Sequence, residues 1–264
     1  MPIRIVINGA LGRMGQEVAR AVIADSDLRL VGAVESSAPQ PYLPVLECPE
    51  LIPFSADLGT AIEKTCPQVI VDFTRASVAM EAARTAIPRK VAMVIGTTGI
   101  SDADLHEIQE LCVAYGVGAV VAPNFSLGAV LLMHLAKIAS RFFANAEIIE
   151  MHHDKKLDAP SGTALATARM MAQARDSRFV YPPTEKEMLS GARGGELDGI
   201  AIHSVRMPGM MAAQEVLFGG KGQTLLLRHD ATSRESYMPG VILAVKAVIE
   251  NRTLIVGLDK LMGL

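Results

Sequence analysis

The chain has 264 residues, a length that fits one large domain or two of modest size. Its 25 Lys and Arg and 28 Asp and Glu residues give a net charge of −3 at pH 7, which argues against a nucleic-acid-binding module and against attachment to an anionic membrane. Half of the residues are hydrophobic and a fifth are charged, a usage typical of folded globular proteins rather than disordered chains.

The cysteines argue against a disulfide framework and a zinc site. Cys48, Cys66 and Cys112 are odd in number and show neither Cys-x-x-Cys nor Cys/His spacing. We therefore expect a reducing, cytoplasmic location. The first residues run directly into an apolar strand pattern without a basic leader or a small-residue cleavage site, so we expect no export signal.

One stretch, residues 111–136, contains no charged side chain and is long enough to span a bilayer. Pro123 and Asn124 interrupt it, and Gly116 and Gly118 help to divide it into strand, loop and helix segments. We therefore expect no membrane span.

The first half of the chain alternates between short runs rich in Val and Ile and longer stretches with helical spacing. The expected strands are residues 4–7, 28–34, 68–73, 91–95 and 117–122. The expected helices are residues 12–24, 57–64, 76–87 and 101–115, the last opening with the capping-box pair Ser101 and Asp104. Strands that are apolar throughout are buried on both faces, so the pattern predicts an α/β fold with a Rossmann-type doubly wound parallel sheet.

A proline-rich stretch, residues 36–54, interrupts this alternation. It contains Pro39, Pro41, Pro44, Pro49 and Pro53. Because proline disfavours both helix interiors and central strands, we expect a surface loop there.

The second half has a different pattern. A helix is expected over residues 127–141 and another over 164–174, with strands at 147–151, 200–205, 215–218 and 224–229. The last three strands are expected to be antiparallel pieces joined by glycine turns, most clearly at 219–222. An amphipathic helix over 237–251 is expected to return to the first domain. We therefore predict a first, α/β domain at residues 1–126 and 235–264, and a second, α+β domain at 127–234.

A glycine-rich turn follows the first strand and opens the first helix: Gly9, Ala10, Leu11, Gly12, Arg13, Met14 and Gly15. Glycines let the backbone approach a pyrophosphate, which the helix N-terminus then stabilises. Glu35 ends the second strand, 20 residues after Gly15, where an acidic side chain accepts hydrogen bonds from the adenine-ribose hydroxyls. Ser36 follows it where an arginine would contact a 2′-phosphate, so the choice between NADH and NADPH stays open.

Two further loops follow later strands at the edge where such sheets bind ligands. They contain Phe73 and Thr74, and Gly96, Thr97, Thr98 and Gly99. Small and hydroxyl residues there allow contact with the ribose and nicotinamide, although ordinary turns before helices have the same composition.

The segment 150–164 concentrates the reactive side chains of the chain. His152 and Lys156 are candidates for delivering the proton that must accompany a hydride. Ser161, Gly162 and Thr163 precede a helical run and suit a bound carboxylate, so we expect an anionic small-molecule substrate. Taken singly, each residue also has a structural explanation. No metal is expected, because adjacent histidines lack a matching carboxylate or cysteine set.

Together these motifs resemble the 4-hydroxy-tetrahydrodipicolinate (dihydrodipicolinate) reductase family over essentially the whole chain. The resemblance rests on the turn at 9–15, Phe73-Thr74, Gly96-Thr97-Thr98-Gly99, Ala122-Pro123-Asn124-Phe125-Ser126, and the run from His152-His153 through Lys156 to Asp158-Ala159-Pro160-Ser161-Gly162-Thr163.

The resemblance implies a cytoplasmic enzyme of the diaminopimelate route to lysine, a homotetramer built through its substrate domains, that reduces a cyclic dicarboxylate with NADH or NADPH. It implies that His152 is the proton donor, that Lys156 is its catalytic partner, and that His153, Gly162 and Thr163 hold the substrate. The implied cofactor-binding residues are Gly9, Ala10, Leu11, Gly12, Arg13, Met14, Glu35, Gly96, Thr97, Thr98, Ala122, Pro123, Asn124 and Phe125.

Two departures from the family pattern are visible. Many members have arginine where this chain has Ser36, and many have Gly-Glu-His in the segment that here reads Ala212-Ala213-Gln214-Glu215. Two alternative functions stay open: another two-domain nicotinamide enzyme, such as a semialdehyde or homoserine dehydrogenase, and a non-catalytic NAD-binding redox sensor.

Overall fold

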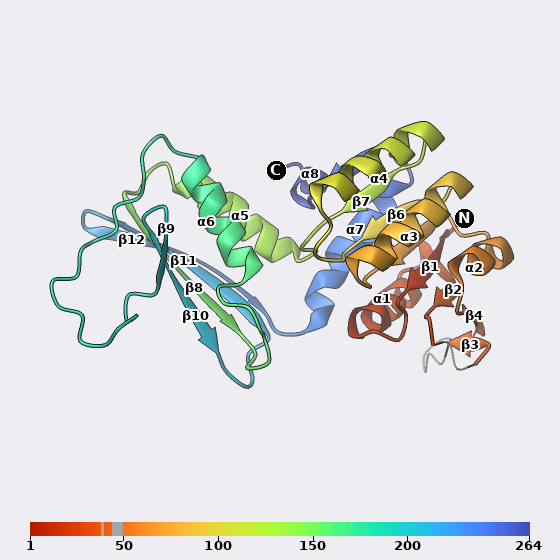
Figure 1. The fold of residues 1–264 in the computed structure, drawn as a ribbon, viewed down its shortest axis with the longest axis horizontal. Coiled ribbons are helices and arrows are strands. Elements are labelled where there is room, and N and C mark those ends of the chain that lie inside the picture. The colour runs from red at the N-terminus through yellow and green to blue at the C-terminus, as the bar shows by residue number, and fades with distance from the viewer. Residues whose placement is uncertain (38–39, 44–49) are drawn as a thin grey trace. The chain divides into compact units, whose positions relative to one another are not determined.

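The computed structural model describes residues 1–37, 40–43 and 50–264. Within it the chain forms two compact units (Figure 1). Unit 1 comprises Met1–Phe125 and Tyr237–Leu264, and unit 2 comprises Ser126–Ser236. Cys48, Pro39, Pro44 and Pro49 lie outside the described residues.

Unit 1 is built on an eight-stranded sheet in the order β13-β7-β6-β5-β1-β2-β4-β3. Every neighbouring pair is parallel except β3 and β4. The central strands are buried along their whole length, as expected for a sheet covered on both faces. The predicted doubly wound α/β fold is confirmed. The strands are β1 (Ile3–Asn8), β2 (Leu28–Val34), β3 (Tyr42–Leu43), β4 (Ile52–Ser55), β5 (Val69–Asp72), β6 (Ala92–Ile95), β7 (Ala119–Val121) and β13 (Leu254–Val256).

The helices of unit 1 form two groups. Helix α1 packs against α7, while α3 packs against both α2 and α4. Helix α7 contacts β5, β6 and β7, so the chain returns to unit 1 after unit 2. The capping box between Ser101 and Asp104 is present at the start of α4. The helices are α1 (Arg13–Ala24), α2 (Leu58–Thr65), α3 (Ala76–Ala86), α4 (Asp102–Tyr115), α7 (Met238–Val248) and α8 (Asp259–Met262).

The prediction of a loop over residues 36–54 is wrong in part, because β3 and β4 lie within it. Strand β4 adds to the sheet beyond β2, and its Ile52 and Phe54 side chains are buried. Pro53 is tolerated because the neighbouring residue supplies the ladder bond: the Phe54 amide donates to the Pro41 carbonyl at 2.8 Å.

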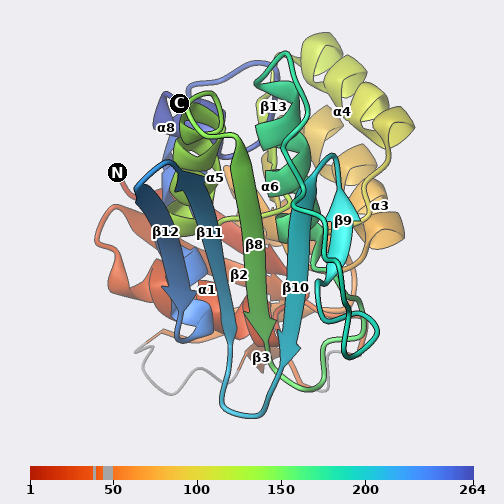
Figure 2. The same cartoon turned by 90° about the vertical axis from the view of Figure 1, so that its left-hand side faces the viewer.

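Unit 2 contains a five-stranded sheet in the order β12-β11-β8-β10-β9. Its strands are β8 (Asn145–His152), β9 (Gly195–Leu197), β10 (Ile200–Arg206), β11 (Ala212–Gly220) and β12 (Gln223–Ala231). Figure 2 shows the sheet with α5 (Leu127–Ala139) and α6 (Gly162–Gln173) on one side of it. Ile148, Val216 and Phe218 point to that side and form a core with Leu132 and Met171.

The direction of β10 differs from the prediction. It runs antiparallel to β9 but parallel to β8, which separates it from β11. Apolar spacing identifies a strand without fixing its neighbours, and here the chain crosses from β10 past β8 to reach β11. The predicted antiparallel hairpin of β11 and β12, closed by a turn containing Gly222, is confirmed.

The uncharged stretch 111–136 is divided among the end of α4, strand β7 and most of α5. Within residues 1–37, 40–43 and 50–264, no helix has the length and apolar character needed to cross a membrane.

Candidate active site

The glycine-rich turn of unit 1 lies between β1 and α1, at the carboxyl end of β1. Gly9 has φ +81°, and a Cβ there would stand 2.7 Å from Cγ2 of Thr74. A Cβ on Gly15 would stand 2.2 Å from the Gly9 carbonyl oxygen. Both positions therefore require glycine, and Gly12 forms the N-cap of α1 without a side chain. The turn thus leaves its backbone open to an incoming anion at the helix N-terminus.

Glu35 lies beside this turn. It follows β2, and its Oε2 accepts a hydrogen bond from the Leu11 amide at 3.4 Å. Ser36 is exposed, as is Arg13 on the first turn of α1. The carboxylate therefore stands next to the turn that would hold a pyrophosphate, as ribose recognition requires.

The buried Asp72 connects three of the loops at this edge of the sheet. Its Oδ1 accepts from the Thr74 hydroxyl at 2.8 Å and from the Thr97 hydroxyl at 2.9 Å. Its Oδ2 accepts from Asn8 Nδ2 at 2.6 Å. Because Asn8 ends β1 and Thr97 follows β6, this carboxylate holds the ends of neighbouring strands in a fixed arrangement.

The remaining cofactor candidates lie at the same edge. A Cβ on Gly96 would stand 2.0 Å from the Phe73 ring, so the ring lies directly against the Gly96 backbone. Phe73 also packs on Phe125, with ring centroids 5.6 Å apart. The Ala122 amide donates to the Ile95 carbonyl at 3.1 Å and thereby ties the loop after β7 to β6. Pro123 and Asn124 continue that loop, and the exposed Thr98 follows Thr97.

The second group of candidates is in unit 2, where β8 ends at His152. His152 Nδ1 contacts Glu150 Oε2 at 2.5 Å, and the His152 ring is only 17% exposed. His153 is half-buried and follows directly. Lys156 Nζ donates to Asp158 Oδ1 at 2.7 Å, so the lysine is held within the loop that follows β8.

Arg206 ends β10, and the parallel register places it opposite His152. Its guanidinium donates to both oxygens of Glu150, at 2.9 and 2.7 Å. It also donates to the Asp158 carbonyl at 2.6 Å. One arginine therefore links the end of β8 to the loop that carries Lys156.

The loop leads into the N-terminus of α6. Ser161 caps this helix by accepting from the Ala164 amide at 3.1 Å, and its own amide donates to Glu150 Oε1 at 3.2 Å. A Cβ built on Gly162 would meet no atom within 4 Å. The space over the first turn, which includes Thr163, is open, and helix N-termini favour anions.

Glu150 is ionised over the whole neutral range. Burial on its own would raise the pKa of this carboxyl, but hydrogen bonds from His152, Arg206 and Ser204 outweigh burial and lower the pKa to about 2. His152 therefore stands beside a permanent negative charge.

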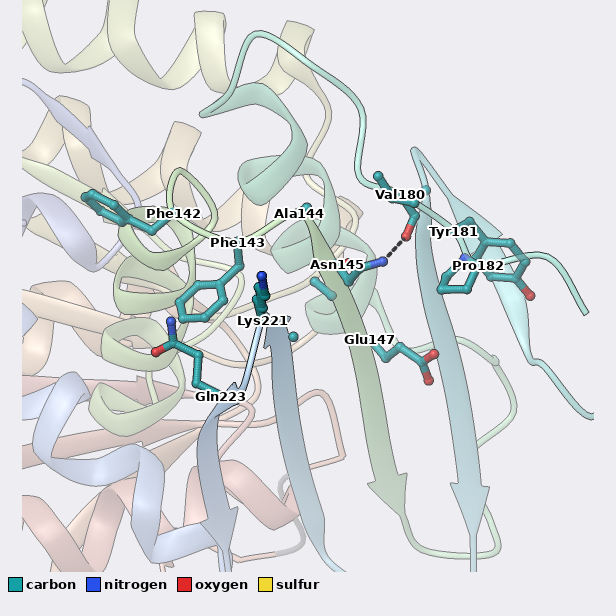
Figure 3. A pocket seen from close by; sticks show the side chains of 14 residues that line it. Phe142, Phe143, Ala144, Asn145, Glu147, Val180, Tyr181, Pro182, Lys221 and Gln223 are labelled. Carbon is teal, nitrogen blue, oxygen red and sulfur yellow. Dashed lines mark hydrogen bonds between the residues drawn. The ribbon is translucent and has the colours of Figure 1, made fainter.

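A cavity of about 610 Å³ lies elsewhere in unit 2 (Figure 3). It surrounds the beginning of β8, where Asn145 Nδ2 donates to the Val180 carbonyl at 2.7 Å. Lys221 and Gln223 of the β11–β12 hairpin also line it. Because β8 ends at His152, this cavity is at the opposite end of the strand from the candidate catalytic residues, and we do not assign the reaction to it.

The described cysteines do not suit thioester chemistry. Cys112 is buried in α4, and burial raises the pKa of its thiol to about 11. Cys66 is exposed at the C-cap of α2, before β5 begins, which is the opposite sheet edge from the glycine-rich turn. Among the residues that the structure describes, no three His, Cys, Asp or Glu side chains cluster as metal ligands.

Two family models match the chain, one in each half. Residues 3–125 match the family model of the dihydrodipicolinate reductase N-terminus, and residues 128–262 match that of its C-terminus. The chain belongs to the dihydrodipicolinate reductase family. The predicted resemblance is confirmed, and the chain is an oxidoreductase of this family, whose members use NADH or NADPH.

Individual members of the dihydrodipicolinate reductase family match over nearly their full length. A 4-hydroxy-tetrahydrodipicolinate reductase of Dehalococcoides mccartyi is 52% identical and covers 100% of this chain and 99% of its own. That of Moorella thermoacetica is 50% identical and covers 98% of each chain. The solved structure of a dipicolinate-bound dihydrodipicolinate reductase from Paenisporosarcina sp. TG-14 superposes with a TM-score of 0.89 at 42% identity, covering 98% of this chain and 99% of that one.

Two side chains of the site, Arg206 and Asp72, were missed by the sequence analysis. Arg206 ends a mainly apolar run, and it reaches Glu150 only because β10 pairs in parallel with β8. Asp72 ends a buried strand, and this acidic residue in an otherwise apolar run is the signal that marks it. Glu150 lies within the reactive segment, but its role depends on Arg206.

Proposed function

We propose that this chain reduces 4-hydroxy-tetrahydrodipicolinate to tetrahydrodipicolinate with NADH or NADPH, in the diaminopimelate route to lysine. The observation that carries the proposal is the arrangement at the end of β8. His152, Lys156 and the open N-terminus of α6 are joined there through Glu150 and Arg206. The relatives with this reaction in their names match the chain over its whole length.

The reaction replaces the 4-hydroxyl group of a cyclic dicarboxylate by hydrogen. The substrate therefore gains a hydride and loses water, and a proton balances the departing hydroxide. A bound reduced nicotinamide supplies the hydride. The protein must hold two carboxylates, deliver a proton and exclude competing water.

His152 is the proton donor in this proposal. A histidine exchanges protons near neutral pH, and the ionised Glu150 beside it stabilises the protonated ring. Lys156, held by Asp158, contributes a positive charge that stabilises negative charge on the substrate during reduction.

The N-terminus of α6 is the proposed substrate-carboxylate site. The Gly162 and Thr163 amides belong to the first turn of the helix, where Gly162 leaves space for a ligand. Ser161 forms the cap below them, and His153 supplies a further donor from the end of β8. The dipicolinate in the structure of the Paenisporosarcina relative is itself a cyclic dicarboxylate of this kind.

Unit 1 fits a nicotinamide dinucleotide. The turn from Gly9 to Met14 is proposed to hold the pyrophosphate and Glu35 the adenine ribose. The loops after β5, β6 and β7 face the same sheet edge and are proposed to hold the rest of the cofactor. Their residues are Phe73, Thr74, Gly96, Thr97, Thr98, Ala122, Pro123, Asn124 and Phe125.

The test is oxidation of NADH and NADPH, followed by absorbance, with the substrate generated in situ by its upstream synthase. We expect oxidation that depends on the synthase. If both cofactors bind and neither is oxidised, the chain is a nucleotide-binding sensor and the proposed reaction is wrong.

We further infer a cytoplasmic homotetramer assembled through unit 2. Ile149, Leu217 and Leu226 alternate with the core-facing residues, so they lie on the sheet face that α5 and α6 leave open, and Leu226 is 53% exposed. Such a face is typical of subunit interfaces. Leu226→Glu should reduce the sedimentation coefficient from that of a tetramer, and an unchanged tetramer would place the interface elsewhere.

A further inference from the structure

Glu150 has an unusual environment for an acidic residue. Its side chain is 0% exposed, and leaving a carboxylate buried is costly unless donors surround it. Here Oε2 accepts from His152 Nδ1 at 2.5 Å and from Arg206 Nη1 at 2.9 Å. Oε1 accepts from Arg206 Nη2 at 2.7 Å and from the Ser161 amide at 3.2 Å. The carboxylate is therefore held in one orientation from both sides.

This arrangement fixes the hydrogen on the His152 ring. An ionised carboxylate only accepts hydrogen bonds, so the Nδ1 atom that contacts it must carry the hydrogen. The Nε2 atom is then the position at which the ring gains and loses its exchangeable proton.

We propose that Glu150, held by Arg206, is a positioning residue for catalysis: it fixes the orientation and tautomer of His152 and ties the Lys156 loop to the same carboxylate. This inference rests on the proposed function, in which His152 is the proton donor. Glu150 acts through His152, so it is not itself a catalytic residue.

Arg206 also fixes the loop that carries Lys156. Arg206 Nη2 donates to the Asp158 carbonyl at 2.6 Å as well as to Glu150. Asp158 in turn accepts from Lys156 at 2.7 Å. The distance between the two proposed catalytic side chains is thus set by one carboxylate and one guanidinium rather than by the exposed loop alone.

The charged and titratable groups around His152 come from three elements. Strand β8 supplies Glu150, β10 supplies Arg206, and the loop after β8 supplies His153, Lys156 and Asp158. The β11 residue paired with His152 is the uncharged Ala212. Removing the charge of Glu150 leaves the guanidinium of Arg206 close to the ring, so the protonated form of His152 should become less stable.

Strand β8 also offers a matched control. Glu147 accepts from Arg193 at 2.8 Å and from His203 at 2.9 Å, so it has the same types of partner. It lies three residues earlier, on the opposite face of the strand, and its side chain is 35% exposed. Glu147→Gln therefore removes a similar carboxylate without touching His152. Because Glu147 lies on the face proposed as the subunit interface, the variant is used as a control once its sedimentation coefficient matches that of wild type.

The experiment compares wild type, Glu150→Gln and Glu147→Gln by kcat, cofactor KM and the pH profile of kcat. We expect Glu150→Gln to lower kcat by about 10²-fold or more, as loss of the carboxylate behind a catalytic histidine does in other enzymes. The pH profile of kcat should move to lower pH, because an opposite charge beside the ring is lost. The cofactor KM should stay unchanged, and Glu147→Gln should match wild type in all three quantities.

Nitrogen NMR of labelled histidine provides a readout that does not depend on turnover. In wild type the neutral His152 ring should carry its hydrogen on Nδ1, and Glu150→Gln should alter this tautomer. If Glu150→Gln does not fold, Glu150→Asp serves instead: it keeps the charge but shortens the reach, so we expect a lower kcat with a smaller shift of the pH profile.

The outcomes separate the two proposals. If wild type shows no synthase-dependent oxidation, the proposed function is wrong, whatever the NMR result. If wild type is active and Glu150→Gln resembles Glu147→Gln in kcat, pH profile and tautomer, the inference about Glu150 is wrong while the proposed function stands. A kcat loss with an unchanged pH profile and tautomer would also overturn it, because it would assign Glu150 a purely structural role.

Discussion

Arg206→Met should strongly destabilise the protein, because it leaves the buried charge of Glu150 without its guanidinium. Arg206 donates to both carboxylate oxygens, at 2.9 and 2.7 Å. Removing one partner of a buried ion pair costs about 3–5 kcal/mol. At roughly 2–4 °C per kcal/mol for a chain of this size, Tm should fall by about 6–20 °C.

The assay is urea unfolding at pH 7, with the free energy of unfolding obtained by linear extrapolation. Arg193→Met is the control, because its partner Glu147 is 35% exposed and partly solvated pairs contribute about 0.2–1 kcal/mol. Combining Arg206→Met with Glu150→Gln should recover part of the lost stability, since no charge is then left buried. A loss below about 1 kcal/mol for Arg206→Met, or one equal to that of Arg193→Met, would refute the reasoning.

The destabilisation should also depend on pH in a defined direction. Burial opposes ionisation of Glu150, but its hydrogen-bond donors lower the pKa from 4.5 to about 2 in the folded protein. A carboxyl whose pKa is lower in the folded state stabilises that state above its unfolded pKa, and this contribution is lost as pH falls. The difference between wild type and Arg206→Met should therefore narrow as pH falls from 4.5 towards 2, and a difference that widens would contradict the charge argument.

Three further changes test the two units separately. His152→Gln should lower kcat by about 10²–10⁴-fold with little change in cofactor affinity, because proton donation acts in the transition state; an unchanged kcat would remove His152 from the mechanism. Ser36→Arg should raise the ratio of kcat/KM for NADPH to that for NADH by about tenfold, through a charge-assisted bond to the 2′-phosphate; a ratio that stays the same or falls would sink this idea. Gly15→Ala places a Cβ 2.2 Å from the Gly9 carbonyl oxygen. It should weaken NADH binding and lower the free energy of unfolding by about 1–3 kcal/mol. An NADH affinity equal to that of wild type in titration calorimetry would show that the turn has room for a Cβ.

The fold of unit 1 could be predicted because its signals are local. The central strands are mainly apolar runs, the helices that follow them have their own periodicity, and Asp57 and Ser101 cap α2 and α4. The missed strands of unit 1 are short: β13 spans Leu254–Val256, β4 spans Ile52–Ser55, and β3 has two residues. They join the sheet because an open edge is available to pair with, and so short a segment carries too little pattern to reveal that.

The candidate site could be predicted only in part, because pairing between strands is a non-local property. His152, Lys156 and Ser161 share one segment of the chain, so the sequence places them together. Arg206 lies 56 residues from Glu150, and nothing in the run around it indicates that β10 is parallel to β8. Gln214 is a second example of a contact that the local sequence does not reveal. It belongs to the segment that departs from the family pattern, and it is buried beside β8, where its side-chain amide donates to the Thr167 hydroxyl at 2.9 Å.

The transferred hydride can be followed from the cofactor to the product. Wild-type protein is supplied with reduced nicotinamide cofactor deuterated on the transferred position at C4, together with the upstream synthase and its substrates, and the product is analysed by mass spectrometry. We expect tetrahydrodipicolinate with one deuterium for each cofactor oxidised. Cofactor oxidation that leaves no deuterium in the product, or a bound cofactor that is never oxidised, would contradict the proposed reaction.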